Sequence, residues 1–439
     1  MNWSTLLSDQ RIDGKKQGFS PGRSPFEQDF DRIVFSYPFR RLQDKTQVHP
    51  LPEDDFVHTR LTHSLEVSSV GRSLGKVVGH HVLQRQPELA DKYTAHDFAS
   101  IVAAAALTHD IGNPPFGHSG EDAISEYFKF GEGQKYQSQV SEAEWADLTT
   151  FEGNAQGFRI LSMTGMKLTF ATLAAFTKYP RQALFPERDK ARRSQKKYGF
   201  FQSEKDSFQQ VAEATGLRSL GAYSWVRHPL VFLVEAADDI CYHLIDLEDG
   251  WRLGLVNYDQ TVELMAGVLK EQFDKSKLSR YDTANERIGV LRALAVGKLI
   301  EEAAELFLAH EKDILHGDYD ISLVDDMPST PVLKEIIKLS IDKIYRSQSV
   351  VQTEAAGFEV LPGLLHAFAD AAMSEKSGSS KRQQAIRRLF PQEMSLALAD
   401  SELSAYHTLQ ACVDFVSGLT DRHAISLYRK IKGISLPNA

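Results

Sequence analysis

The chain has 439 residues, of which 42% are hydrophobic and 25% are charged. This balance is typical of a globular protein and excludes a disordered acidic chain or a coiled-coil rod. The formal charge of −9 disfavours a protein that clamps nucleic acid with its whole surface, although a local basic patch stays compatible with it. Cys241 and Cys412 are too few for a disulfide framework, which favours a reducing compartment. Because no apolar run approaches the ~18 residues of a membrane span and the first residues lack an apolar secretory segment, we expect a cytoplasmic protein without a membrane partner.

The first fifty residues are polar and rich in glycine and proline, so we expect an N-terminal arm with little regular structure. Apolar residues then recur at helical spacing over 64–86. A second helix is expected over 97–109, where four consecutive alanines indicate close packing. The polar stretch 131–150 is expected to be a surface insertion. The charged stretch 186–207 is expected to be a mobile, solvated loop, with a lid over phosphates or a nucleic-acid contact as the alternatives.

No proline lies between Pro229 and Pro328, which favours long helices in that part of the chain. Alternating patterns typical of strands are scarce, and the best of them, LRSLGAYSWV at 217–226, is short. The helical tail, 334–432, is expected to form either a second lobe or an oligomer surface. The sequence therefore predicts a mostly α-helical protein.

The densest cluster of reactive side chains is LTHDIGNPPFGHSGE, residues 107–121. An apolar helix delivers His109 and Asp110 together near its end, where adjacent side chains can meet a single ion. His118 and Glu121 follow, three positions apart and therefore on one helix face. A carboxylate beside an imidazole fixes its tautomer and raises its pKa, which suits a general acid. Taken alone, the His-Asp pair is weak evidence for a site, because a helix-terminal histidine with a charge partner is the more common explanation.

Two other segments favour a metal site over a helix-terminal histidine with a charge partner. His63 opens the first amphipathic helix, and Asp238, Tyr242 and Asp246 recur every four residues within the apolar helix EAADDICYHLIDLED. Carboxylates are rarely buried without a partner, so this stripe indicates a metal, a cation or a polar ligand, unless it is a solvated helix face.

A set of His63, His109, Asp110 and Asp238 would offer two nitrogen and two oxygen donors. Such a set suits a divalent ion such as Mn²⁺, Mg²⁺ or Fe²⁺, whereas a closed zinc site more often uses thiolates. Four ligands on a six-coordinate ion leave positions for water and a substrate oxygen.

The motifs HTRLTHSLEV, LTHDIGNPPFGHSGE, FEGNAQGFR and EAADDICYHLIDLEDG occur here in the order found in deoxyguanosine triphosphate triphosphohydrolases. With RRLQDKTQV and KKYGFFQSEKDSF, the chain resembles this family of HD phosphohydrolases over residues 38–250, and more weakly beyond. The resemblance implies an all-α HD-domain fold with an additional helical C-terminal lobe, and a homo-oligomer, often a hexamer. The expected organisation is an arm at 1–55, an HD core at 56–250 and a helical region at 251–439 that completes the pocket and the oligomer.

The resemblance also assigns residues by motif. Its four metal ligands fall on His63, His109, Asp110 and Asp238, with Asp239 as the fallback for the last, and its catalytic pair falls on His118 and Glu121. Substrate-binding positions fall on Gln47, Arg60, Asn113, Asn154, Lys178, Tyr179, Lys197, Tyr242 and Asp246, and Val48 and Glu354 lie near the base.

The expected reaction is hydrolysis of a dNTP, with dGTP foremost, at the α-phosphorus to deoxynucleoside and triphosphate, with Mn²⁺ or Mg²⁺ as cofactor. His118 would protonate the 5′-oxygen, Gln47 and Asp246 would hold the 3′-hydroxyl, and Tyr242 would crowd the 2′ carbon against ribonucleotides. The alternatives are an HD phosphohydrolase acting on another nucleotide and a catalytically silent sensor of dNTP or single-stranded nucleic acid. Activation by a second dNTP or by single-stranded DNA is left open.

Overall fold

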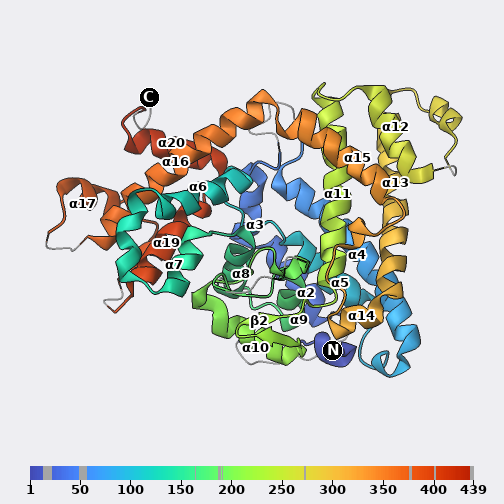
Figure 1. Ribbon diagram of the computed structural model, residues 1–439, viewed down its shortest axis with the longest axis horizontal. Helices are drawn as coiled ribbons and strands as arrows, with labels where there is room; N and C mark the ends of the chain where they lie inside the picture. Colours follow the sequence, from blue (N-terminus) through green and yellow to red (C-terminus); the bar gives the residue numbers. More distant parts are fainter. Residues whose placement is uncertain are drawn as a thin grey trace.

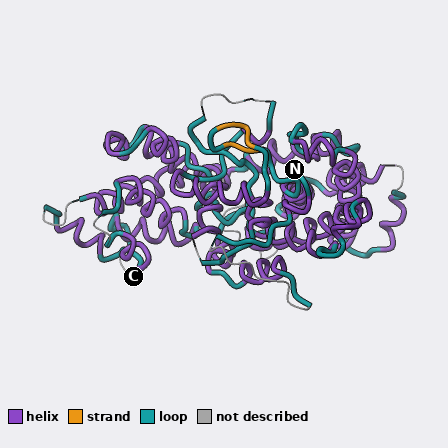
Figure 2. The backbone as a smooth tube through the Cα atoms, turned by 90° about the horizontal axis from the view of Figure 1, so that it is seen from below, coloured by secondary structure: helices purple, strands orange, loops and turns teal. Residues whose placement is uncertain are grey.

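The computed structural model describes residues 1–12, 22–48, 57–163, 165–185, 189, 191–270, 273–374, 378–399 and 402–435. Helices make up nearly all of their regular structure, which confirms the all-α prediction (Figure 2). A small antiparallel hairpin, β1 (Ser219–Gly221) with β2 (Ser224–Trp225), falls within 217–226, the best of the predicted strand patterns. No helix among the described residues has the length and apolarity to cross a membrane.

Four helices pack on one another in the right-hand part of the view in Figure 1: α4 (Arg60–Arg85), α5 (Ala95–Leu107), α11 (Val231–Arg252) and α13 (Ala284–Ala309). The helices expected over 64–86 and 97–109 and in the proline-free stretch are thereby confirmed. Close packing of α4 on α5 depends on a glycine row in α4, because a Cβ at Gly75 would lie 2.8 Å from the Phe98 carbonyl oxygen. This packing brings the first turn of α4 and the end of α5 together.

The N-terminal residues form helices rather than an unstructured arm: α1 (Trp3–Leu6), α2 (Pro25–Val34), α3 (Tyr37–Arg41) and η1 (Leu42–Asp44). The expectation of little regular structure is wrong for these residues. Pro25 stands at the first position of its helix, where proline is favoured, and Ser24 with Glu27 forms a capping box. Trp3 and Phe26 are fully buried in the main apolar core. Residues 13–21 and 49–56 lie outside the described residues.

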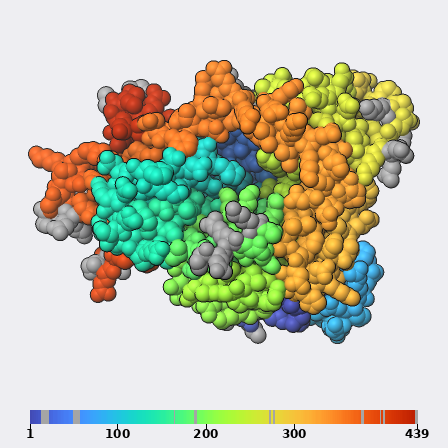
Figure 3. All heavy atoms as spheres, in the orientation of Figure 1, coloured from blue at the N-terminus to red at the C-terminus, as the bar shows by residue number. Residues whose placement is uncertain are grey.

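A second apolar cluster joins the middle of the chain to its C-terminal part. It contains α6 (Gly117–Lys129), α7 (Glu142–Thr149) and part of α8 (Gly153–Met163) together with α16 (Gln348–Met373), α19 (Ala405–Ser417) and α20 (Asp421–Ile431). Figure 3 shows α16 in orange running across the top of the molecule towards the red C-terminal helices.

Two polar stretches are better ordered than the sequence suggests. Residues 131–150 form η3 (Glu132–Gln139) and α7, and Leu148 is buried in the second cluster. In the stretch 186–207, the described residues fold as a packed segment held by Phe200 and Phe201, so a mobile loop is wrong for them. Residues 186–188 and 190, which include Arg188 and Lys190 of the basic run, lie outside the described residues.

The remaining elements are shorter or lie at the periphery. They are η2 (Pro87–Leu89), α9 (Phe170–Phe176), η4 (Arg193–Gln195), η5 (Gln202–Glu204), α10 (Lys205–Thr215), α12 (Tyr258–Leu269), η7 (Lys275–Arg280), α14 (Glu311–His316), η8 (Leu323–Asp325), α15 (Thr330–Ser340), η9 (Ile341–Tyr345, a π-helical turn), α17 (Lys381–Arg387) and α18 (Gln392–Ala397).

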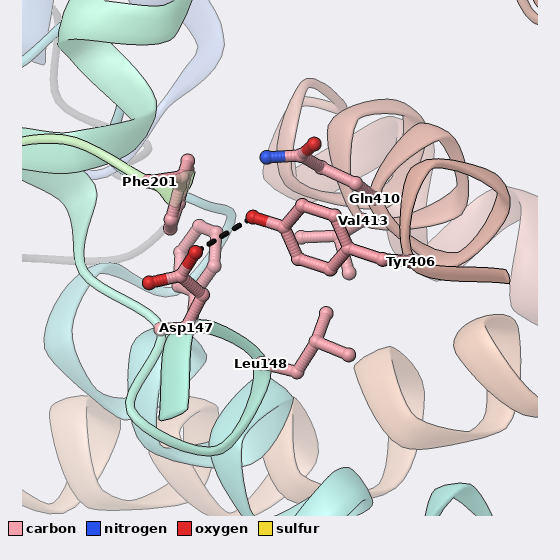
Figure 4. A pocket seen from close by; sticks show the side chains of 7 residues that line it. Asp147, Leu148, Phe201, Tyr406, Gln410 and Val413 are labelled. Carbon is pink, nitrogen blue, oxygen red and sulfur yellow. Dashed lines mark hydrogen bonds between the residues drawn. The ribbon is translucent and has the colours of Figure 1, made fainter. Parts of the chain in front are cut away.

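Polar contacts also join α7 to α19 around a small cavity, which Figure 4 shows from close by. The Tyr406 hydroxyl donates a hydrogen bond of 2.6 Å to the Asp147 carboxylate, and both side chains are buried. The Gln202 amide N–H donates 2.7 Å to the same oxygen. Asp147 thus connects the middle of the chain to its C-terminal helices.

Candidate functional site

Two histidines and two aspartates converge where α4, α5 and α11 meet. His63 lies in the first turn of α4, His109 and Asp110 follow the end of α5, and Asp238 lies in α11. Asp238 Oδ1 is 3.2 Å from His63 Nε2 and 3.5 Å from His109 Nε2. His63, His109 and Asp110 each offer a ligand atom within 4.8 Å of the others. Three segments distant in sequence therefore present imidazole nitrogens and carboxylate oxygens to one small volume.

The donor set fits a divalent ion. His109 Nε2 is buried and has no hydrogen-bond partner within the described structure, while its Nδ1 lies 2.7 Å from the Ala106 carbonyl oxygen. A backbone carbonyl on one ring nitrogen is the usual support for an imidazole that binds metal through the other. Two nitrogens and two carboxylates match the ligands of Mn²⁺ or Fe²⁺ better than those of a thiolate zinc site.

Nearby positive charges favour the ionised form of both carboxylates, which are partly buried. Burial would raise the pKa of Asp110, but the Arg60 guanidinium at 2.5 Å and His109 hold that pKa well below its usual range. Burial also opposes ionisation of Asp238, yet His109 and His63 lower its pKa to about 2. The adjacent Asp239 is different, because burial raises its pKa to about 7 and its carboxylate accepts from the Ser322 hydroxyl. Asp238, and not the fallback Asp239, faces the histidines.

The candidate catalytic loop, residues 110–118, connects this cluster to α6. Asn113 donates its side-chain amide to Asp110 at 2.6 Å. Phe116 and Gly117 both adopt left-handed backbone conformations, with φ of 65° and 59°, and this turn starts the helix that carries His118. The His118 side chain is exposed, and the surrounding protein together with the Lys197 and Arg60 charges lowers its pKa.

Glu121 does not contact His118 as the expected pairing implied. Its carboxylate accepts from the Gly153 amide at 2.8 Å and lies 3.4 Å from Lys197 Nζ, and the described structure contains no hydrogen bond between Glu121 and His118. A Cβ at Gly153 would lie 2.6 Å from Glu121 and would also clash with Asn113, so glycine is required where these two side chains meet. His118 and Glu121, the expected catalytic pair, therefore lie on the same helix, but no hydrogen bond joins them in the described structure.

Lys197 forms ion pairs with two buried carboxylates, Glu121 and Glu152. Its ammonium group lies 2.9 Å from Glu152 and 3.4 Å from Glu121, and these charges raise its pKa against the effect of burial. Asn154 donates its side-chain amide to Glu152 at 2.7 Å. Glu152 thus brings the assigned residues Lys197 and Asn154 together beside Glu121.

A second polar group lies further along α11. Tyr345 donates its hydroxyl to Asp246 at 2.7 Å and stacks on the ring of Tyr242, with centroids 5.6 Å apart. Burial raises the pKa of Asp246 to about 8. The sequence analysis missed Tyr345, whose position in a π-helical turn is a feature often found at functional sites.

Lys178 and Tyr179 lie beside a buried carboxylate that the motifs did not identify. Glu235 lies one turn before Asp239 on α11 and pairs with Lys178 at 3.1 Å, Arg193 at 2.5 Å and Arg227 at 2.7 Å. Three cations lower the pKa of Glu235 against its complete burial. Arg193 is therefore not part of a solvated loop, which corrects that interpretation of the basic run.

The remaining assigned positions lie on two segments around this region. Gln47 follows η1 and has a buried side-chain oxygen without a hydrogen-bond partner in the described structure. Val48 packs against the main core, and Glu354 is half-buried on α16. In Figure 3 blue N-terminal residues lie at the base of a depression beneath α16.

The helical fold and the histidine-aspartate cluster define a metal-dependent phosphohydrolase of the HD class. Residues 60–149 match the HD domain, and residues 330–430 match the phosphohydrolase-associated domain.

Relatives carry the comparison further. The chain is 43% identical over 99% of its length to the whole of a deoxyguanosinetriphosphate triphosphohydrolase-like protein of Synechocystis. It is 38% identical over full length to a protein of the same description from Pseudomonas aeruginosa. It is also 30% identical to a deoxyguanosinetriphosphate triphosphohydrolase of Klebsiella pneumoniae, over 93% of this chain and 94% of that one. The chain belongs to the deoxyguanosinetriphosphate triphosphohydrolase family.

Proposed function

We propose that the protein is a metal-dependent dNTP triphosphohydrolase that prefers dGTP and produces deoxynucleoside and triphosphate. The observation that supports it most is the convergence of two histidines and two aspartates on one small volume, with His118 and the cations Arg60 and Lys197 nearby. The converging residues are His63, His109, Asp110 and Asp238. When Mn²⁺ or Mg²⁺ is held by the four side chains, it supplies Lewis-acid activation of a phosphate oxygen and of water. The names of the relatives in Synechocystis and Klebsiella favour dGTP.

The chain's own residues account for departure of the nucleoside. Water adds to the α-phosphorus, the bond from that phosphorus to the 5′-oxygen breaks, and His118 donates its proton to that oxygen. The charges of Lys197 and Arg60 lower the pKa of His118 in the free protein. The negative charge of a bound triphosphate offsets these two charges, so the pKa of His118 rises and its protonated form is favoured. Lys197, Arg60 and Asn154 bind and orient the phosphates.

Sugar selectivity is assigned to the second polar group on α11. Asp246 and Gln47 hold the 3′-hydroxyl, and the Tyr242 ring, held by its stack on Tyr345, crowds the 2′ carbon. Tyr242→Ala is expected to raise the GTP rate relative to dGTP, because the space it leaves admits a 2′-hydroxyl. An unchanged ratio of the two kcat/KM values would remove Tyr242 from the sugar site.

We also propose a cytoplasmic homo-oligomer, which light scattering after gel filtration would test. Free, buried Cys241 and Cys412 support a reducing compartment.

The deciding experiment is an assay with Mn²⁺ or Mg²⁺ that offers the four dNTPs singly and mixed and separates the phosphorus products. Triphosphate with deoxynucleoside supports attack at the α-phosphorus and shows the base preference. Activity only in the mixture indicates a dNTP effector, and a second series with single-stranded DNA tests that effector. Orthophosphate or pyrophosphate indicates a different HD phosphohydrolase, and binding without turnover that is unchanged in His118→Ala indicates a sensor.

A further inference from the structure

The turn between α19 and α20 contacts two segments that carry candidate site residues. Asp421, at the start of α20, is 1% exposed and uses both carboxylate oxygens. Its Oδ1 accepts from the Phe116 amide at 3.1 Å, and its Oδ2 accepts from the Thr46 amide at 3.0 Å. One buried carboxylate therefore joins the candidate catalytic loop to the segment that precedes Gln47.

Further bonds connect the same parts of the molecule. Lys45 donates its ammonium group to the Asn113 carbonyl in the candidate catalytic loop and, at 3.0 Å, to the Ser417 carbonyl at the end of α19. Arg41 donates to the Gly418 carbonyl at 2.9 Å. Arg41 and Lys45 thus bind carbonyl oxygens at the α19–α20 turn, and Asp421 of that turn binds the amides of Thr46 and Phe116.

The hydrogen bond from Asp421 reaches the backbone at Phe116, whose φ is positive. Phe116 is a non-glycine residue in a left-handed conformation, two residues before His118. Such a conformation persists only where its surroundings over-determine it. Asp421 accepts a hydrogen bond from the amide of Phe116. The Phe116 ring packs so closely on α16 that a Cβ at Gly357 would lie 3.1 Å from the ring.

We propose that Asp421 is a positioning residue that sets the placement of His118 relative to Gln47. It acts through the Phe116 amide at the leaving-group end of the site and through the Thr46 amide at the sugar end. The inference rests on the proposed function, since the roles of His118 and Gln47 come from it. The C-terminal helices thereby contribute to catalysis although they carry none of the metal ligands assigned above.

The test compares Asp421→Ala and Asp421→Asn with a matched control. Glu302 on α13 is also a buried carboxylate, and it accepts from the Ser329 amide at 2.9 Å and the Ser329 hydroxyl at 3.0 Å, away from the candidate site. Glu302→Ala should lower the Tm while kcat stays within about twofold of wild type. Asp421→Ala should lower kcat for dGTP on the order of a hundredfold and raise KM, because small misplacements of reacting groups have costs of that order. Asp421→Asn keeps one acceptor oxygen, so an intermediate kcat is expected.

Two further measurements separate positioning from folding and from the proposed function. Mn²⁺ affinity should stay within about twofold in both Asp421 variants, and hydrogen exchange should speed up at the Thr46 and Phe116 amides. If the wild type hydrolyses no dNTP, the proposed function is overturned. Faster exchange at the two amides in the Asp421 variants would then still show that Asp421 holds these amides. A folded Asp421→Ala with wild-type kcat, unchanged exchange at both amides, or an equal loss of kcat in Glu302→Ala would overturn the positioning role. If Asp421→Ala does not fold, kcat and exchange in Asp421→Asn decide by the same criteria.

Discussion

Two buried polar groups in this molecule use carboxylates in opposite ways. At the candidate metal centre, nearby cations and imidazoles hold the pKa values of Asp110 and Asp238 below their usual range. At the junction of α7 and α19, burial raises the pKa of Asp147 to about 7, with Glu204 and Glu144 adding to the rise. The Tyr406 hydroxyl and the Gln202 amide bind Asp147, and the described structure gives it no cationic partner.

The unpartnered atoms differ as well. At the metal centre they include His109 Nε2, and ligand atoms of His63, His109 and Asp110 lie within 4.8 Å of one another, as a bound cation requires. At the junction they are Asp147 Oδ1 and the Gln410 amide, beside a cavity of about 10 Å³ that has room for about one water molecule. Burial alone therefore does not identify a carboxylate that binds metal. Such a site is indicated where the surroundings favour the ionised carboxylate and several ligand atoms converge on one point.

Asp110→Ala should have the largest effect, because it removes a ligand and leaves Arg60 without its partner. Turnover should fall roughly 10⁴-fold or to background, since loss of the ion removes several kcal/mol of transition-state stabilisation. Mn²⁺ titration calorimetry and the dGTP assay measure the two effects together. Asp122→Ala, an exposed position on α6, is the matched control. Normal Mn²⁺ affinity in Asp110→Ala would remove Asp110 from the metal centre.

His118→Ala should lower kcat by about 10²- to 10³-fold while Mn²⁺ affinity and Tm stay unchanged. A general acid acts in its protonated form, so wild-type kcat should fall as the pH rises through the pKa of His118. This alkaline limb should be absent from the profile of the variant. Full turnover in His118→Ala, or the same alkaline limb in both proteins, would exclude His118 as the acid.

Asp147→Asn should change stability rather than activity. Burial raises the pKa of Asp147 in the folded protein to about 7, above the ordinary value of 3.8, so folding favours the protonated carboxyl. The contribution of this carboxyl to stability is complete below about pH 4 and is lost as the pH rises to about 7. Between pH 5 and pH 7 the wild type should lose about 2 kcal/mol of unfolding free energy relative to the variant. Urea unfolding at the two pH values measures this difference. Parallel curves for the two proteins would mean that Asp147 titrates normally.

The sequence predicted what depends on local spacing. Helical periodicity located α4 and α5, and the breakers after Asp110 predicted the end of α5 and the loop before His118. The N-terminal helices were not predicted because glycine and proline are typical of loops, although Pro25 stands at the first position of α2 and Ser24 and Glu27 form a capping box.

The metal centre and its surroundings depend on tertiary packing. No local rule joins His63 and Asp238 with His109, so the sequence offered them only as a chemically suitable donor set, which the family resemblance then assigned. Tyr345 and Asp421 carry no motif of their own, and their contacts with Asp246 and Phe116 arise from the way α16 and α20 pack on the core. The lack of a contact between His118 and Glu121 also follows from packing, since Gly153 and Lys197 occupy the carboxylate instead.

Tyr345→Phe should have the smallest effect and tests the sugar end of the site. The change keeps the stack on Tyr242 but removes one hydrogen bond to Asp246, so a loss of about 1 kcal/mol, roughly fivefold in kcat/KM for dGTP, is expected. Because that hydrogen bond lowers the pKa of Asp246, its loss should also raise that pKa further. The decisive control is a substrate without a 3′-hydroxyl: if Asp246 binds that group, wild type and Tyr345→Phe should hydrolyse 2′,3′-dideoxy-GTP at the same rate. An equal fivefold loss on both substrates would show that Tyr345 acts on the fold of the pocket and not through the 3′-hydroxyl.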